Sequence, residues 1–175
     1  IRIAEQLLAL WLEGAGGDSP EDFELLWYFA ANHIITDAFE KRSQKGYLFT
    51  IGDADCHMKL SKESIKRIFG DTAQELTSAQ LVKMAEKKFE LFHIHIQSYS
   101  DGIPTGFSQL LPGKVLTIPR TSVKYIPELI ISTMELMNGK DMEEVISQWS
   151  ELSQPIVRNS VKNLVVKKGK KGFFF

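Results

Sequence analysis

The sequence lacks most of the features that mark secreted, membrane-spanning or nucleic-acid-binding proteins. Its 175 residues contain one cysteine, Cys56, which excludes an internal disulfide framework and favours a reducing compartment such as the cytoplasm. No apolar run approaches the roughly 20 residues of a membrane span. Charged residues interrupt the first 13 residues, as they would not in a signal peptide. The 21 basic and 22 acidic residues nearly balance, so no general attraction to nucleic acid or to an anionic membrane is expected.

An initiator methionine is also missing. The chain begins at Ile1, within a pattern of apolar residues spaced as in a helix. This start indicates a segment cut from a longer protein or, alternatively, a processed start. What is present is ordinary for a globular domain, with 43% hydrophobic and 25% charged residues. A chain of this length fits one domain and can bury a sizeable core.

Helical patterns alternate with short apolar runs along the chain. We expect helices over 1–13, 20–43, 61–69, 76–88, 121–137, 141–152 and 155–165, and strands over 47–51, 89–97 and 114–118. This alternation predicts an α/β fold with a doubly wound, mostly parallel sheet flanked by helices, its strands in their order along the chain. The run 47–51 is apolar except for Thr50, so we expect it to be a central strand of the intact domain.

The loop after the first of these strands is the first candidate site. In parallel sheets, functional loops follow the carboxyl ends of strands. The carboxylates of Asp53 and Asp55 suit Mg²⁺, because hard cations prefer oxygen ligands. A softer metal would instead recruit Cys56 and His57. The alternative is a solvated acidic loop whose side chains cap neighbouring backbone.

The second candidate is the glycine-rich loop that ends at Ser19. Pro20 follows this serine and suits the first turn of a helix. A hydroxyl at a helix N-terminus can bind an anion or offer an oxygen to a metal. It can equally serve as a simple N-cap, and one residue can do both.

Other chemically capable residues are expected to be structural. His93 and His95 alternate along a strand and share one face, but no third ligand follows at a recognisable spacing, which favours two core histidines. Cys56 is expected to be a buried or idle thiol. The glycines at 106 and 113 lack the spacing of a phosphate loop, which argues against nucleotide binding.

Three sequence segments together resemble the second half of a von Willebrand factor A-type domain, as found in bacterial members of that family. The first is WLEGAGGDS at 11–19, and the second is KGYLFTIGD at 45–53. The third is FHIHI at 92–96, followed at a fitting distance by VLTI at 115–118. The resemblance covers 1–139 and implies a VWA-like, Rossmann-like sheet without its first strands. Residues 140–175 would be a helical extension with a basic tail.

The resemblance implies a divalent-cation site of the adhesion type. Such a site takes ligands from three loops. Ser19 matches the second loop if serine replaces the usual threonine, Asp53 matches the third, and the first has no counterpart here. Asp55 would lie beside the ligands and tune their charge. Mg²⁺ or Mn²⁺ would be the cofactor. The side-chain oxygens of Ser19 and Asp53 would then lie on the order of 4–7 Å apart.

The resemblance further implies a non-enzymatic protein-interaction domain. The partner would present a carboxylate to the cation, and some relatives act beside ATPase-containing complexes. The main alternative is a metal-dependent hydrolase using Asp53, Asp55 and His57, although the sequence offers it no positioned nucleophile. A purely structural module is the third hypothesis.

Overall fold

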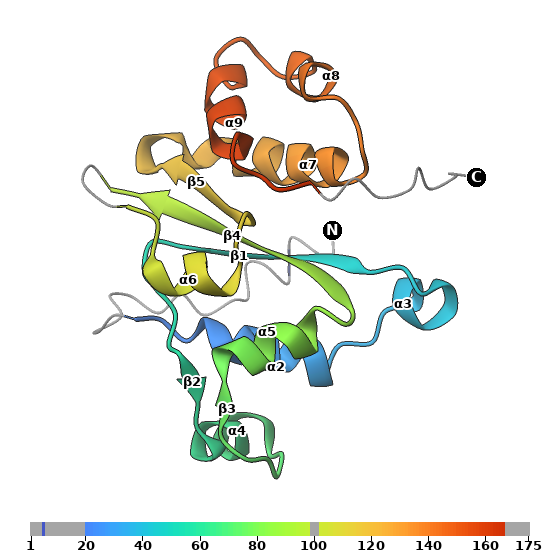
Figure 1. Cartoon of the computed structure of the whole chain (residues 1–175), viewed down its shortest axis with the longest axis vertical. Helices are drawn as coiled ribbons and strands as arrows, with labels where there is room; N and C mark the ends of the chain where they lie inside the picture. The colour runs from blue at the N-terminus through green and yellow to red at the C-terminus, as the bar shows by residue number, and fades with distance from the viewer. Residues whose placement is uncertain (1–4, 6–19, 99–101, 167–175) are drawn as a thin grey trace.

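The computed structural model describes residues 5, 20–98 and 102–166, and these form three layers with a sheet in the middle (Figure 1). The sheet strands are β1 (Gly46–Gly52), β4 (Phe89–Gln97) and β5 (Val115–Pro119). The helices on one face are α2 (Phe23–Asn32), α5 (Ser78–Ala85) and α6 (Thr105–Leu110); those on the other are α7 (Ile126–Met137), α8 (Met142–Ser147) and α9 (Gln154–Val161). The remaining elements are α3 (Asp37–Arg42), β2 (Lys59–Leu60), α4 (Lys62–Phe69), β3 (Leu76–Thr77) and the 3₁₀ helix η1 (Arg120–Tyr125).

The three strands of the sheet are parallel and lie in the order β1, β4, β5. Both the pairing and the order confirm the sequence prediction, and the arrangement is consistent with a Rossmann-like fold. β1 is an edge strand, because no strand of the described residues pairs with its outer side. That β1 lies centrally in an intact domain stays a prediction.

The two faces of the sheet bury separate apolar clusters. The α2/α5/α6 side packs around Phe23, Trp27, Leu81, Leu91 and Phe107. The α7/α8/α9 side packs around Ile94, Leu116, Ile118, Leu129, Val145 and Val161. Helices α8 and α9 therefore share a core with β5 and α7, although they lie beyond the boundary expected at residue 139. None of the helices among the described residues is long and apolar enough to cross a membrane.

Two expected helices differ from the prediction in form. The helix expected over 20–43 is divided into α2 and α3. The Thr36 hydroxyl accepts a hydrogen bond from the Phe39 N–H at 3.3 Å and begins a second helix, after two β-branched residues that favour a break. The helix expected over 121–137 begins as η1 and becomes α-helical at Ile126. Helix α6 lies outside every helix and strand range expected from the sequence.

His93 and His95 lie on the α2/α5/α6 face of β4 and are buried, as expected for core histidines. The His93 ring stacks on Phe107 with their ring centroids 3.5 Å apart, and its Nδ1 lies 2.9 Å from the Thr50 hydroxyl. Its Nε2 is buried and makes no hydrogen bond. Burial, together with the neighbouring His95, lowers the pKa of His93 to about 3, against a smaller opposing effect of Asp55.

The His93→Gln variant should lose part of the acid sensitivity of the fold. Between pH 3 and 6.5 an unfolded chain protonates this histidine and the folded chain does not, so stability rises with pH there. From pH 6.5 down to pH 5 the wild type should lose about 1.6 kcal/mol more than the variant, because the unfolded histidine is half protonated at pH 6.5 and the full slope is about 1.4 kcal/mol per pH unit. Urea unfolding at several pH values measures this difference, and parallel curves for the two proteins would contradict it.

Candidate metal centre

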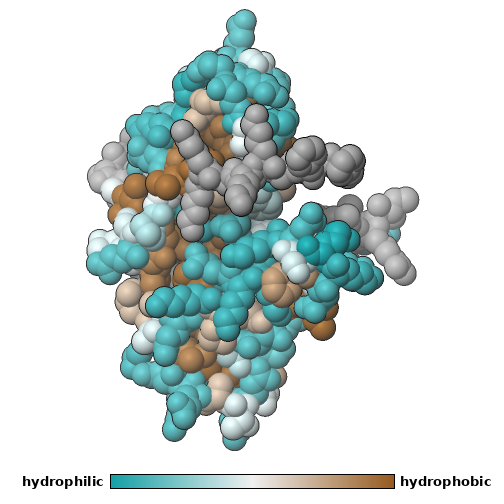
Figure 2. All heavy atoms as spheres, turned by 45° about the vertical axis from the view of Figure 1, so that its right-hand side comes forward, coloured by the Kyte–Doolittle hydropathy of each residue, from teal (hydrophilic) through white to brown (hydrophobic). Residues whose placement is uncertain are grey.

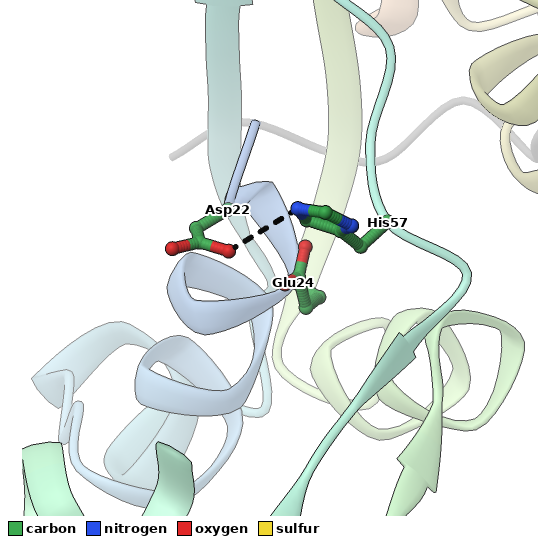
Figure 3. A group of neighbouring side chains, drawn as sticks. All are labelled: Asp22, Glu24 and His57. Carbon is green, nitrogen blue, oxygen red and sulfur yellow. Dashed lines mark ion pairs between the residues drawn. The ribbon is translucent and has the colours of Figure 1, made fainter. Parts of the chain in front are cut away.

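Three ligand-bearing side chains from two separate segments converge at the start of α2. They are Asp22, Glu24 and His57, and each offers a ligand atom within 4.8 Å of the others. Figure 3 shows both carboxyl groups directed toward the histidine ring. In the part of the chain that the structure describes, no other group of three histidine, cysteine or acidic side chains meets this distance.

The two carboxylates are positioned by the first turn of α2. Asp22 precedes the helix, and its side chain makes no capping hydrogen bond. Instead its Oδ1 lies 3.5 Å from Nε2 of His57. Glu24 is the second residue of the helix. The positive end of the helix dipole favours carboxylates at both positions.

The loop after β1 is fixed so that His57 faces these carboxylates. The Ser78 hydroxyl donates to the His57 carbonyl at 2.5 Å, and the Ser78 N–H donates to the Met58 carbonyl at 2.9 Å. The Glu21 N–H donates to the Asp55 carbonyl at 2.8 Å. The loop is thereby attached to α5 on one side and to the start of α2 on the other.

Glu24 is the most unusual member of the group. It is only 2% exposed, and its Oε2 is buried without a hydrogen-bond partner. Burial is the main reason why the pKa of Glu24 is raised to about 7, and the nearby Asp22 raises it further, while backbone N–H groups oppose the shift. A buried carboxylate with an unsatisfied oxygen is costly. A bound cation would supply both the missing charge and the missing contact.

The spacing of the three donors is compatible with a bound metal ion. Two ligands about 2.1 Å from a tetrahedral ion lie about 3.4 Å apart, close to the 3.5 Å between Asp22 and His57. One imidazole nitrogen with two carboxylate oxygens suits Zn²⁺ or Mn²⁺ better than Mg²⁺, which prefers oxygen alone. Three protein ligands leave coordination positions open. Asp22, Glu24 and His57 line an open pocket of about 500 Å³, together with residues that include Lys59, Ser61 and Ser64.

The residues predicted from the family resemblance lie elsewhere. Asp53 forms an ion pair with Arg120, and both side chains are exposed. This pair lies beside a pocket of about 290 Å³ at the carboxyl ends of β4 and β5, lined by residues including Arg120 and Thr121. Ser19 is outside the described residues, so its expected closeness to Asp53 stays a prediction.

Asp55 is engaged with the backbone. Its carboxylate accepts hydrogen bonds from the N–H groups of Cys56, Gly106 and Phe107, at 2.9, 2.9 and 3.2 Å. A Cβ atom at position 106 would lie 2.6 Å from Oδ1 of Asp55, so this close approach requires glycine. Asp53, Asp55 and His57 therefore interact with three different partners instead of sharing one site.

Cys56 is buried beside the metal centre without belonging to it. Burial and the nearby Asp55 raise the pKa of its thiol to about 12, so it stays protonated at neutral pH. This burial agrees with the expectation of a buried thiol. In the described part of the chain, the metal-capable set includes His57 but not its neighbour Cys56.

The sequence analysis identified the loop after β1, which supplies His57, but it considered neither Asp22 nor Glu24 as a ligand. His57 was considered there as a ligand for a softer metal. Glu24 did give a signal. It precedes Trp27 and Tyr28 by three and four residues, so it belongs to the buried face of an otherwise apolar helix stripe.

The structural roles of the two loop aspartates predict different stability effects. Asp55→Ala should lower the free energy of unfolding by on the order of 2–3 kcal/mol, because three backbone N–H groups lose their acceptor. Asp53→Ala should cost less than about 1 kcal/mol, because its ion pair is exposed. Chemical denaturation of both variants measures the contrast, and equal losses would refute these assignments.

Comparisons with known proteins identify no relative. No protein-family model, curated protein or solved structure matches the chain. The von Willebrand factor A resemblance thus depends on sequence motifs alone, and function has to be argued from the geometry of the metal centre.

Proposed function

We propose that this chain is a non-enzymatic protein-interaction domain that engages its partner through a divalent cation held by Asp22, Glu24 and His57. The main support is the buried carboxyl group of Glu24, whose Oε2 has no hydrogen-bond partner. The same residue contributes a ligand atom within 4.8 Å of those of the other two. A cation at this position would stabilise the ionised glutamate and retain open positions for a ligand from another molecule.

The surroundings favour binding over catalysis. Among the described residues, no serine, threonine or cysteine side chain hydrogen-bonds the His57 ring, which pairs with Asp22. The hydroxyls of Ser61 and Ser64, which line the pocket, hydrogen-bond each other at the start of α4. The Ser61 hydroxyl accepts a hydrogen bond from the Ser64 N–H and donates one to the Ser64 hydroxyl. Neither of these two hydroxyls contacts a base that would activate it as a nucleophile. Asp53, Asp55 and His57, on which the hydrolase alternative depends, contact different partners and do not form one site.

The partner would present a carboxylate to the open coordination positions. This agrees with the adhesion-type chemistry that the von Willebrand factor A resemblance implies, in a cytoplasmic setting and with an ATPase-containing complex as one source of the partner. The histidine ligand changes the expected metal. Of Mg²⁺ and Mn²⁺, the donor set favours Mn²⁺.

Metal titration tests the cation site directly. Isothermal titration calorimetry should show one Mn²⁺ or Zn²⁺ site, with Mg²⁺ much weaker. Glu24→Gln and His57→Ala should each weaken binding at least about tenfold, because each removes a ligand. Glu21→Gln is the matched control, since it alters an exposed acid at the same helix start. Asp53→Asn should bind like the wild type. Loss of binding in Asp53→Asn, with binding intact in Glu24→Gln, would favour the Ser19–Asp53 site instead.

Peptide binding tests the role of the open coordination positions. The Mn²⁺-loaded protein should bind a short glutamate-containing peptide more tightly than its glutamine counterpart, and a chelator should abolish the difference. Hydrolysis of chromogenic carboxylic esters and phosphate esters is measured in parallel to test for enzymatic activity. Hydrolysis of either that depends on the metal and on Glu24 would overturn the non-enzymatic assignment, as would equal affinity for the two peptides.

A further inference from the structure

The outer edge of β1 is unprotected among the described residues. No described strand pairs with it, and from Gly46 to Gly52 it contains neither a charged residue nor a proline. Exposed edges of this kind offer backbone N–H and C=O groups to another strand. Natural proteins usually protect them with charge, proline or a covering segment.

One face of β1 and its flanks has a distinctive order of side chains. Alternation places five side chains on the α7 side, in the order Lys45, Tyr47, Phe49, Ile51 and Asp53. Contacts on this face agree: Phe49 stacks on Phe92 with ring centroids 5.1 Å apart, and the Lys45 ammonium lies 3.6 Å from Glu90. The stretch is therefore basic at one end, apolar in the middle and acidic at the other.

Much of this face is accessible. Ile51 is 41% exposed, and the side chains of Lys45 and Asp53 are 42% and 53% exposed. On the face of the molecule drawn in Figure 2, hydrophobic surface lies among more hydrophilic surface. An accessible apolar strip beside an unpaired strand edge is suited to pairing with another strand.

We infer that β1 is a self-association edge, at which two copies of the chain pair their β1 strands antiparallel about a two-fold axis through Phe49. In this register Lys45 lies opposite the partner's Asp53. Tyr47 lies opposite the partner's Ile51, and the two Phe49 side chains meet at the axis. Every pair lies on the same face, because strand pairing about an axis perpendicular to the sheet preserves the faces.

The positions of Lys45 and Asp53 at opposite ends of the strand favour an antiparallel arrangement of the two copies. A parallel pairing would place lysine against lysine and aspartate against aspartate, whereas antiparallel pairing opposes unlike charges at both ends. Two-fold symmetry also requires antiparallel strands at such a junction. The result is one continuous sheet of six strands, three from each copy. This inference is independent of the proposed cation site.

A charge-exchange series tests the pairing. In sedimentation velocity the wild type should be dimeric, and Asp53→Lys should weaken the dimer at least about tenfold by placing lysines opposite each other. The double variant Lys45→Asp with Asp53→Lys should restore it. Both variants lose the intramolecular pair with Arg120, and the double variant also loses the pair between Lys45 and Glu90, so a restored dimer cannot come from regained pairs within one copy. Asp37→Lys, an exposed charge reversal on α3, is the matched control.

Cysteine substitution tests the register. Under mild oxidation, a mixture of Tyr47→Cys and Ile51→Cys proteins should form a disulfide-linked pair, whereas each alone should not. The native Cys56 is buried and should not interfere. A monomeric wild type at about 100 μM, at which a specific micromolar dimer would be populated, would overturn the proposal and favour the competing prediction that β1 is a central strand of an intact domain. So would failure of the double charge exchange to restore the dimer, or an equal yield of cross-links in each single variant.

Discussion

The carboxylate of Asp55 is the contact on which the arrangement of the metal centre depends. It accepts the N–H groups of Gly106 and Phe107 at the beginning of α6, while its own backbone carbonyl accepts the Glu21 N–H. One residue thus joins the loop after β1 to α6 and to the start of α2. His57 follows two residues later and is brought to the same helix that supplies Glu24. The loop can therefore present the accessible ring of His57 as a ligand, although its neighbour Cys56 is buried.

Glu24 imposes the second constraint, which is electrostatic. A carboxyl group that is almost fully buried must either take up a proton or acquire a counter-charge. Its pKa of about 7 means that the two states are nearly balanced at neutral pH without a cation. Because Glu24 can take up a proton, the chain can fold without a metal. A cation could still bind and stabilise the site, since it needs to displace only a weakly held proton from Glu24.

The sequence predicts the sheet well because its signals are local. The run 89–97 coincides with strand β4, and the helix that was expected to start at Ser61 is α4, which has Ser61 as its N-cap. The metal centre depends on contacts between distant residues. The backbone bridge between Glu21 and Cys56 brings the start of α2 beside the loop that contains His57. These two segments are far apart in the sequence, so no local spacing pattern predicts their contact. Asp22 and Glu24 satisfy the helix-dipole rule equally well with or without a metal, so local reasoning could not separate the two roles. The division of the helix at Thr36 was similarly hidden by a continuous apolar pattern.

The edge of β1 and the metal centre are linked by their position on one strand. In the proposed dimer the two β1 strands run in opposite directions, so the loops that follow them lie at opposite ends of the junction. With seven residues in β1 and about 3.3 Å per residue, the two His57 loops are separated by at least roughly 20 Å. A partner with two carboxylates at that spacing would bind both cations, and its second contact would be intramolecular. Weak single sites would then yield a tight complex, which is the form of binding that an open, three-ligand cation site suits.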